Sequence, residues 1–161
     1  VLRGEDDART WLEAFAANKP VAYEKNGAVR DAVNAGEVAL GLVNHYYLYE
    51  KIAAEGAKSV VAQNQYLPGD IGGLVNVAGI GALENSDNPE ASQCLASYLV
   101  SDSAQKFFVE KSFEYPLVDG IVPYEGLPTL AELDPPSIDL SDLQSIAETQ
   151  ELLNDVGLLS L

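Results

Sequence analysis

Apolar residues recur along this chain in two patterns, one typical of helices and the other of strands. Apolar positions three or four residues apart predict helices at 5–18, 27–34, 46–55, 89–100 and 102–111, and a last helix that ends near residue 156. Short uninterrupted apolar runs predict strands over 38–43, 58–63 and 74–82. Runs of this kind are typical of parallel sheets, which are covered on both faces. The pattern therefore predicts an α/β fold.

Local signals predict where these elements begin and end. Asn88-Pro89 and Ser101 mark two helix starts, and Asp139 or Ser141 is expected to cap the last helix. Residues 69–73 are predicted to form a loop or hinge. The stretch 115–137 holds five of the eight prolines, which indicates irregular crossing segments.

Polar residues gather where strand 38–43 meets helix 46–55. Asn44 is placed to cap this helix, and Asn26, eighteen residues earlier, is placed to cap helix 27–34. In open α/β sheets, ligands bind at the carboxyl ends of strands, where helix N-termini offer free N–H groups and the positive end of the dipole. Two such helix starts flanking one strand predict a site for a small oxyanion.

Tyr46 and Tyr47 lie at the same junction. Consecutive side chains diverge in regular structure, so both phenols can reach one ion only where the backbone changes from strand to helix. A phenol ionises near pH 10, and a highly charged metal ion displaces its proton, so the pair is a candidate site for a hard cation such as ferric ion. The alternative is one core ring and one surface ring. His45, the only histidine, is a ligand, a neighbour of the ligands or a surface residue.

Several motifs occur in a fixed order from the first helix to the last. They are Trp11-Leu12-Glu13-Ala14-Phe15, Lys25-Asn26-Gly27-Ala28-Val29, Ala32-Val33-Asn34-Ala35-Gly36-Glu37-Val38, Asn44-His45-Tyr46-Tyr47, Asp70-Ile71-Gly72-Gly73, Tyr115-Pro116-Leu117 and Val156-Gly157-Leu158-Leu159. With these motifs the chain resembles the second half of periplasmic ferric-ion-binding proteins, the substrate-binding components of iron ABC transporters. The Asn-x-Tyr-Tyr element, at its fixed distance from Asn26, is the most specific part of the resemblance.

The resemblance implies a fold and a site. The fold is periplasmic-binding-protein-like, a three-layer α/β/α lobe with a mixed, mostly parallel sheet. Residues 1–73 and 119–161 correspond to the second lobe and residues 74–118 return to the first lobe, whose own chain is missing here. Tyr46 and Tyr47 match the tyrosinates that ligate ferric ion (Fe3+). Asn26 and Asn44 match residues that hydrogen-bond a synergistic anion, phosphate or carbonate, and the family's further ligands come from the first lobe.

Composition narrows the class of partner. The net charge is 9 − 25 = −16, which argues against nucleic acid and anionic membranes as partners, favours a cation weakly and is also explained by solubility. The single cysteine, Cys94, excludes an intrachain disulfide and is expected in the core of helix 89–100. No apolar run approaches the roughly 20 residues of a membrane span. The absence of methionine and the start at Val1 suggest a processed or truncated product.

Three hypotheses follow. The leading one is a binding protein and not an enzyme: the extracytoplasmic component of an ABC importer, which binds ferric ion with an oxyanion and docks on an ABC permease. Such a protein is periplasmic or extracellular, and is free or tethered as a lipoprotein. The second is a protein of the same fold for an oxyanion or small organic solute. The third is a hydrolytic enzyme with His45 as general base. We expect residues 1–161 alone to bind iron weakly, and to associate with another copy or with first-lobe chain through 74–82 and 89–100.

Overall fold

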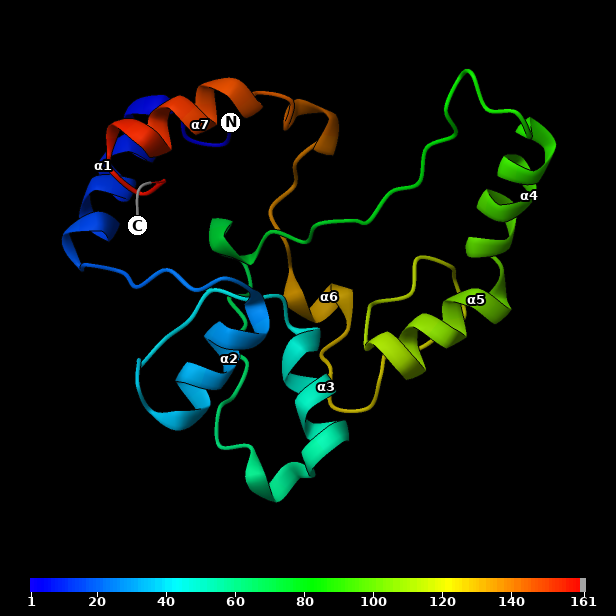
Figure 1. Cartoon of the computed structure of the whole chain (residues 1–161), viewed down its shortest axis with the longest axis horizontal. Coiled ribbons are helices and arrows are strands. Elements are labelled where there is room, and N and C mark those ends of the chain that lie inside the picture. The colour runs from blue at the N-terminus through cyan, green and yellow to red at the C-terminus, as the bar shows by residue number, and fades with distance from the viewer. Residues whose placement is uncertain (160–161) are drawn as a thin grey trace. The chain divides into compact units, whose positions relative to one another are not determined.

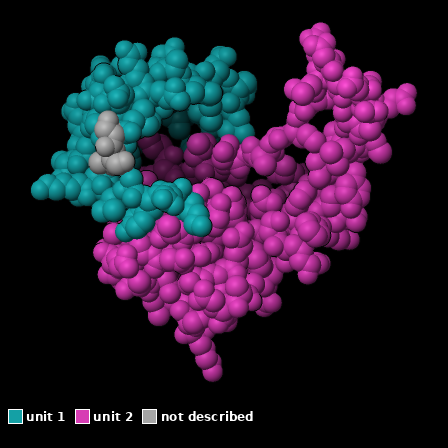
Figure 2. Space-filling view, in the orientation of Figure 1, with its two compact units in different colours: residues 1–25, 136–161 teal, residues 26–135 magenta. Residues whose placement is uncertain are grey.

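The computed structural model describes residues 1–159 (Figure 1). The chain divides into two compact units. One unit combines residues 1–25 with the segment that begins at residue 136, and the other consists of residues 26–135 (Figure 2). The grouping of 1–73 with 119–161 refers to a complete two-lobed protein and stays a prediction. Residues 160 and 161 of that range lie outside the described residues.

The smaller unit joins the first and the last helix of the chain. The Arg9 guanidinium on α1 (Glu5–Ala17) donates to the Asp155 carboxylate at the end of α7 (Ile146–Asp155), at 3.3 Å. The bounds of α1 confirm the helix predicted at 5–18 to within one residue. The predicted caps of the last helix are wrong, because Asp139 accepts from the N–H of Ser141 and caps the short helix η4 (Leu140–Asp142).

The larger unit contains the other helices. They are α2 (Asn26–Ala35), α3 (Tyr46–Glu55), η1 (Ala57–Ser59), η2 (Ile71–Gly73), α4 (Pro89–Leu99), α5 (Asp102–Phe107), η3 (Phe108–Ser112) and α6 (Leu130–Leu133). The helices predicted at 27–34, 46–55 and 89–100 are confirmed to within one residue at each end. The helix predicted at 102–111 ends early, because α5 is followed by the π-helical turn η3.

The segments predicted as strands run as irregular chain, except that residues 58 and 59 belong to η1, and no strand forms within residues 1–159. At 58–63 a side chain of α2 takes the backbone donors. The N–H groups of Val61 and Ala62 donate to Oδ1 of Asn34, at 2.8 and 3.2 Å, where a strand would donate to a neighbouring strand. The side chain of Asn34 therefore replaces a sheet ladder in this segment.

At 38–43 the chain lacks a covering layer on one side. Gly41 passes so close to α2 that an added Cβ would lie 2.5 Å from Cγ1 of Val29, so only glycine fits there. Leu40 and Leu42, on the alternate positions, are 87% and 76% exposed. Because a buried parallel strand needs neighbours on both faces and both edges, the mixed sheet stays a prediction for the complete protein.

The core of the larger unit lies between α3, α5 and the segments after them. Leu48 on α3 is buried, as are Phe113 and Leu127. The buried amide of Gln105 donates to the carbonyl of Leu99 at 2.9 Å and accepts from the N–H of Leu117 at 2.7 Å. This side chain therefore satisfies its polar groups while it ties the start of segment 115–137 to α5.

The apolar face of α4 lies open to solvent. Cys94 is exposed on this helix, so its predicted place in the core is wrong, and Leu95 and Tyr98 beside it are 52% and 55% exposed. The preceding segment also exposes Val77 and Ile80. The predicted core face of this helix is therefore its exposed side within residues 1–159. No helix of this part of the chain is long and apolar enough to cross a membrane.

Candidate metal and anion site

The starts of α2 and α3 are joined by their asparagines. Oδ1 of Asn26 accepts a hydrogen bond from the backbone N–H of Asn44 at 3.3 Å. Neither residue is an N-cap as predicted: Asn26 is the first residue of α2, and His45 occupies the cap position of α3 without a side-chain cap bond. The Asn26 side chain accepts from a segment 18 residues away, and the Asn44 side chain donates to the Tyr46 hydroxyl, two residues further along the chain. The structure thus brings together both predicted anion-site residues.

The tyrosine pair lies at the first turn of α3. The rings of Tyr46 and Tyr47 are 4.7 Å apart between centroids and tilted by 35°, and both residues are half-buried. The side-chain amide of Asn44 donates to the hydroxyl of Tyr46 at 3.1 Å. The two phenols therefore lie side by side and within reach of the asparagine pair.

The surroundings of Tyr46 favour its protonated form. Burial raises the pKa of its phenol above 10.0, and the neighbouring Tyr47 hydroxyl raises it further, while the hydrogen bond from Asn44 acts in the opposite direction. A phenol in this state can donate one hydrogen bond and accept others. It becomes a strong anionic donor only when a cation displaces the proton.

An ion-pair network connects α2 with α3 at the backbone of Tyr47. Nη1 of Arg30 donates to the backbone carbonyl of Tyr47 at 2.9 Å, and Nε and Nη2 donate to the carboxylate of Asp31 at 3.0 and 3.2 Å. Lys51, four residues after Tyr47, contacts Asp31 at 3.0 Å and Glu55 at 2.8 Å. These partners lower the pKa of the Asp31 carboxyl, through Arg30 first and Lys51 second. Arg30 is not among the predicted site residues, although its spacing of four residues from Asn26 places both on one face of α2.

His45 is fixed in place by a hydrogen bond from its ring to the backbone. Its Nε2 lies 2.8 Å from the carbonyl oxygen of Phe113, so this nitrogen carries the proton and donates it. Burial lowers the pKa of the ring, partly offset by the bond to Phe113. The ring also contacts Tyr46 edge-on, with centroids 5.5 Å apart, and Tyr115 at 5.1 Å. The histidine therefore packs beside the tyrosine pair and fixes the start of α3 to segment 113–115.

A second group of phenols is engaged with the backbone. Tyr49 donates to the carbonyl of Gly126 at 3.0 Å, and Tyr115 donates to that of Pro128 at 2.8 Å. Burial raises the pKa of Tyr66 to about 12, and it also raises that of Tyr115. The Tyr49 hydroxyl therefore binds the proline-rich segment 115–130 to α3, and the Tyr115 hydroxyl forms a bond within that segment, so both have a structural task.

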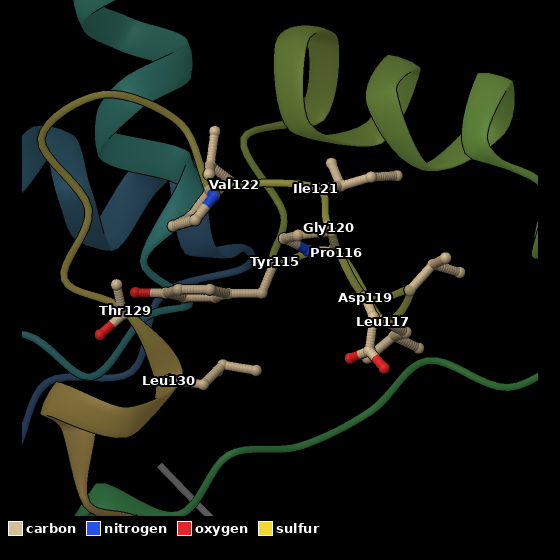
Figure 3. A pocket seen from close by; sticks show the side chains of 11 residues that line it. Tyr115, Pro116, Leu117, Asp119, Gly120, Ile121, Val122, Thr129 and Leu130 are labelled. Atoms are coloured by element: carbon tan, nitrogen blue, oxygen red, sulfur yellow. The ribbon is translucent and has the colours of Figure 1, made fainter.

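Two cavities open on the larger unit, and neither is lined by Tyr46 or Tyr47. The first, of about 440 Å³, is formed by segment 115–123 with Thr129 and Leu130, and the ring of Tyr115 lies across it (Figure 3). The second, of about 380 Å³, lies between α3 and segment 60–66. Among residues 1–159, no group of three or more His, Cys, Asp or Glu side chains is placed to hold a metal ion. The predicted site in this part of the chain thus consists of phenols and amides.

Comparison with known proteins identifies a family and several relatives. The model of the family described as bacterial extracellular solute-binding protein matches residues 4–106. The Fe(3+)-binding periplasmic protein of Serratia marcescens is 32% identical over 160 residues, which are 98% of this chain and 47% of that protein. Iron uptake protein A1 of Synechocystis is 27% identical, over 98% of this chain and 46% of that protein. The major ferric iron-binding protein of Neisseria meningitidis serogroup B is 28% identical, over 98% and 47%.

A solved structure is similar over almost the whole chain. Iron-bound HitA from Pseudomonas aeruginosa superposes with a TM-score of 0.88 at 33% sequence identity, over 97% of this chain and 50% of that protein. This match confirms the periplasmic-binding-protein-like fold. The chain spans about half the length of the curated relatives that it matches.

Proposed function

The chain belongs to the bacterial extracellular solute-binding protein family, and on that premise we propose that it binds ferric ion for an ABC importer. Support comes from relatives named for ferric-ion binding or iron uptake, and from the similarity to iron-bound HitA. The protein acts outside the cytoplasm, free or tethered by a lipid, and passes its ion to an ABC permease. It performs no covalent chemistry on the ion.

In this proposal Tyr46 and Tyr47 bind the ion as phenolates. The observation that carries it is the placement of the two rings 4.7 Å apart, both half-buried, at one helix start. Phenolate is a known protein ligand of iron in haem enzymes, and its hard anionic oxygen suits a trivalent cation. Binding displaces both phenolic protons.

Asn26 and Asn44 bind the accompanying anion, phosphate or carbonate. Each asparagine side chain carries two N–H donors in addition to its carbonyl oxygen, and such donors suit an oxyanion. The bond from Asn44 to the Tyr46 hydroxyl supports this role, because it places an amide beside the phenol oxygen that faces the ion. The anion in turn offsets part of the charge of the ferric ion.

The remaining ligands come from the other half of the protein. Two phenolates and one anion leave an octahedral ferric shell partly open, and the chain spans about half the length of its relatives. We therefore assign residues 1–73 and 119–161 to the second lobe, with a mixed, mostly parallel sheet, and residues 74–118 to a segment that returns to the first lobe. Closure of the two lobes completes the shell, and their hinged opening releases the ion.

One observation favours a second candidate, a site for an oxyanion or a small organic solute. The raised pKa of Tyr46 keeps its phenol protonated, and a protonated phenol can donate a hydrogen bond to such a solute. Calorimetry with phosphate, carbonate or small carboxylates in iron-free buffer separates the two candidates. Tight binding without iron favours the second, and binding only in the presence of ferric ion favours the first.

A visible spectrum tests the leading proposal. Ferric nitrilotriacetate plus phosphate or carbonate, added to the protein in the longest form that its gene encodes, should produce a phenolate-to-iron charge-transfer band. Tyr46→Phe and Tyr47→Phe should each weaken the band, and the double variant should abolish it. Tyr98→Phe, which removes an exposed phenol on α4, is the matched control and should leave the band unchanged. An unaltered band in the double variant would refute the assignment.

A further inference from the structure

Arg30 makes an unusual set of bonds for a residue outside the predicted site. All of its three guanidinium nitrogens donate: Nε and Nη2 to Asp31, and Nη1 to the backbone carbonyl of Tyr47, 17 residues away. Its side chain is only 16% exposed. A backbone carbonyl has two lone pairs, so Tyr47 can accept this bond without giving up its place in α3.

The planar guanidinium suits this double task. One edge of the group is held by the carboxylate of Asp31, and the other reaches the carbonyl in the first turn of α3. A fork of this kind loses little freedom per bond, because its donors are fixed relative to one another. Lys51, on α3, also contacts Asp31, and its other ion pair is with Glu55. Of these two cations, Arg30 is the one that bonds to the first turn of α3, at the carbonyl of Tyr47.

The bond couples the two halves of the candidate site. Asn26 lies one turn before Arg30 on α2, and the tyrosine pair lies on α3. The bond from Asn44 to Asn26 joins the loop before α3 to α2, and the bond from Arg30 joins the first turn of α3 to α2. Together these two bonds fix the rotation and the register of the phenols relative to the asparagines.

We propose that Arg30 is a positioning residue of the tyrosine site, which through the Tyr47 carbonyl holds both phenol oxygens in the geometry that one ion requires. This inference rests on the proposed function for its effect on iron. Arg30 itself does not touch the ion. Its charge is balanced by Asp31, so it acts through geometry and not by attracting the anion.

Three variants separate positioning from general stability. Arg30→Gln removes the fork, Arg30→Lys keeps the charge but cannot hold Asp31 and reach Tyr47 at once, and Lys51→Met removes an ion pair between α2 and α3 while leaving the Tyr47 bond intact. With ferric nitrilotriacetate and phosphate, Arg30→Gln should weaken binding about tenfold and shift the charge-transfer band, as expected for one lost charged hydrogen bond. Arg30→Lys should recover part of the affinity. Lys51→Met should stay within about twofold of wild type, a change of less than 0.5 kcal/mol by the same relation.

A second readout needs no metal. In protein labelled with ¹³C at the ring carbon that carries the tyrosine hydroxyl, the Tyr46 and Tyr47 signals of the iron-free protein should move in Arg30→Gln and stay in place in Lys51→Met. Equal effects of Arg30→Gln and Lys51→Met on affinity, band and ring signals would overturn the proposal. If wild type shows no charge-transfer band, the proposed function fails by itself. The ring signals then decide alone, and unmoved signals in Arg30→Gln would also refute the positioning role.

Discussion

The pH dependence of ferric binding counts the phenolates in the site. A phenol of ordinary pKa, about 10, is neutral at pH 7, and ionising it there costs about 4 kcal/mol, which the metal must supply. Tyr46 needs more, because burial and the adjacent Tyr47 hydroxyl raise its pKa. Each phenol that binds as phenolate therefore releases one proton, and the apparent affinity rises about tenfold per pH unit for each proton released.

Comparison between variants isolates this effect. Hydrolysis of ferric ion and ionisation of the anion also depend on pH, but they are common to every variant. Between pH 5.5 and 7.5, the ratio of wild-type affinity to that of Tyr47→Phe should grow by about tenfold per pH unit. The ratio of wild-type affinity to that of the double variant Tyr46→Phe, Tyr47→Phe should grow by about 100-fold per pH unit, since two protons are released.

Competition against a chelator of known pH behaviour measures these ratios, and the exposed Tyr98→Phe variant controls for general effects of losing a phenol. A wild-type to double-variant ratio that does not change with pH would refute the account of two phenolates. A ratio that grows only tenfold per unit would show that one of the two tyrosines binds as a neutral phenol or not at all.

Three further predictions concern the fold around the site. Leu48→Ala should lower the free energy of unfolding by about 2–5 kcal/mol in urea titrations, because it opens a cavity beneath the first turn of α3. The pKa of Asp31 is lowered in the folded state, so its ion pairs stabilise the fold fully above the ordinary value of 3.8, and this contribution disappears as the pH falls below that value. Acid titration should therefore show a smaller loss of stability in Asp31→Asn than in wild type, and the difference should shrink in high salt. Residues 1–161 as a separate chain should self-associate through the exposed face of α4. Sedimentation velocity should then show a monomer for the double variant Leu95→Glu, Tyr98→Ser. Equal association of the wild-type chain and this variant would contradict the prediction.

Helices could be predicted from the sequence because their determinants are local. The 46–55 prediction matches α3 at both ends, and Ser101 caps α5 by accepting from the N–H of Ala104. The cap assigned to Asn26 failed for the opposite reason, because its side chain accepts from the loop before α3, a contact that depends on tertiary structure. The Asn44 side chain donates to the Tyr46 hydroxyl and makes no cap bond.

Extended segments and ion pairs show the limit of the same approach. The run 38–43 has the composition of a buried strand, but a strand is completed by hydrogen bonds to its neighbours, and none forms within residues 1–159. Cys94 was wrongly predicted as core, because the burial of a helix face depends on what packs against it and not on the spacing of its apolar residues. The contact of Arg30 could not be predicted, because a charged residue on a helix is usually solvated and only the fold brings the carbonyl of Tyr47 within its reach.

The position of the iron tests the central claim most directly. Crystals of the longest form of the protein, grown with ferric ion and phosphate, should be measured with X-rays at energies above and below the iron absorption edge. We expect one strong anomalous peak that bridges the phenol oxygens of Tyr46 and Tyr47, with the anion beside Asn26 and Asn44. A fully occupied peak at any site that lacks both phenol oxygens would contradict the account.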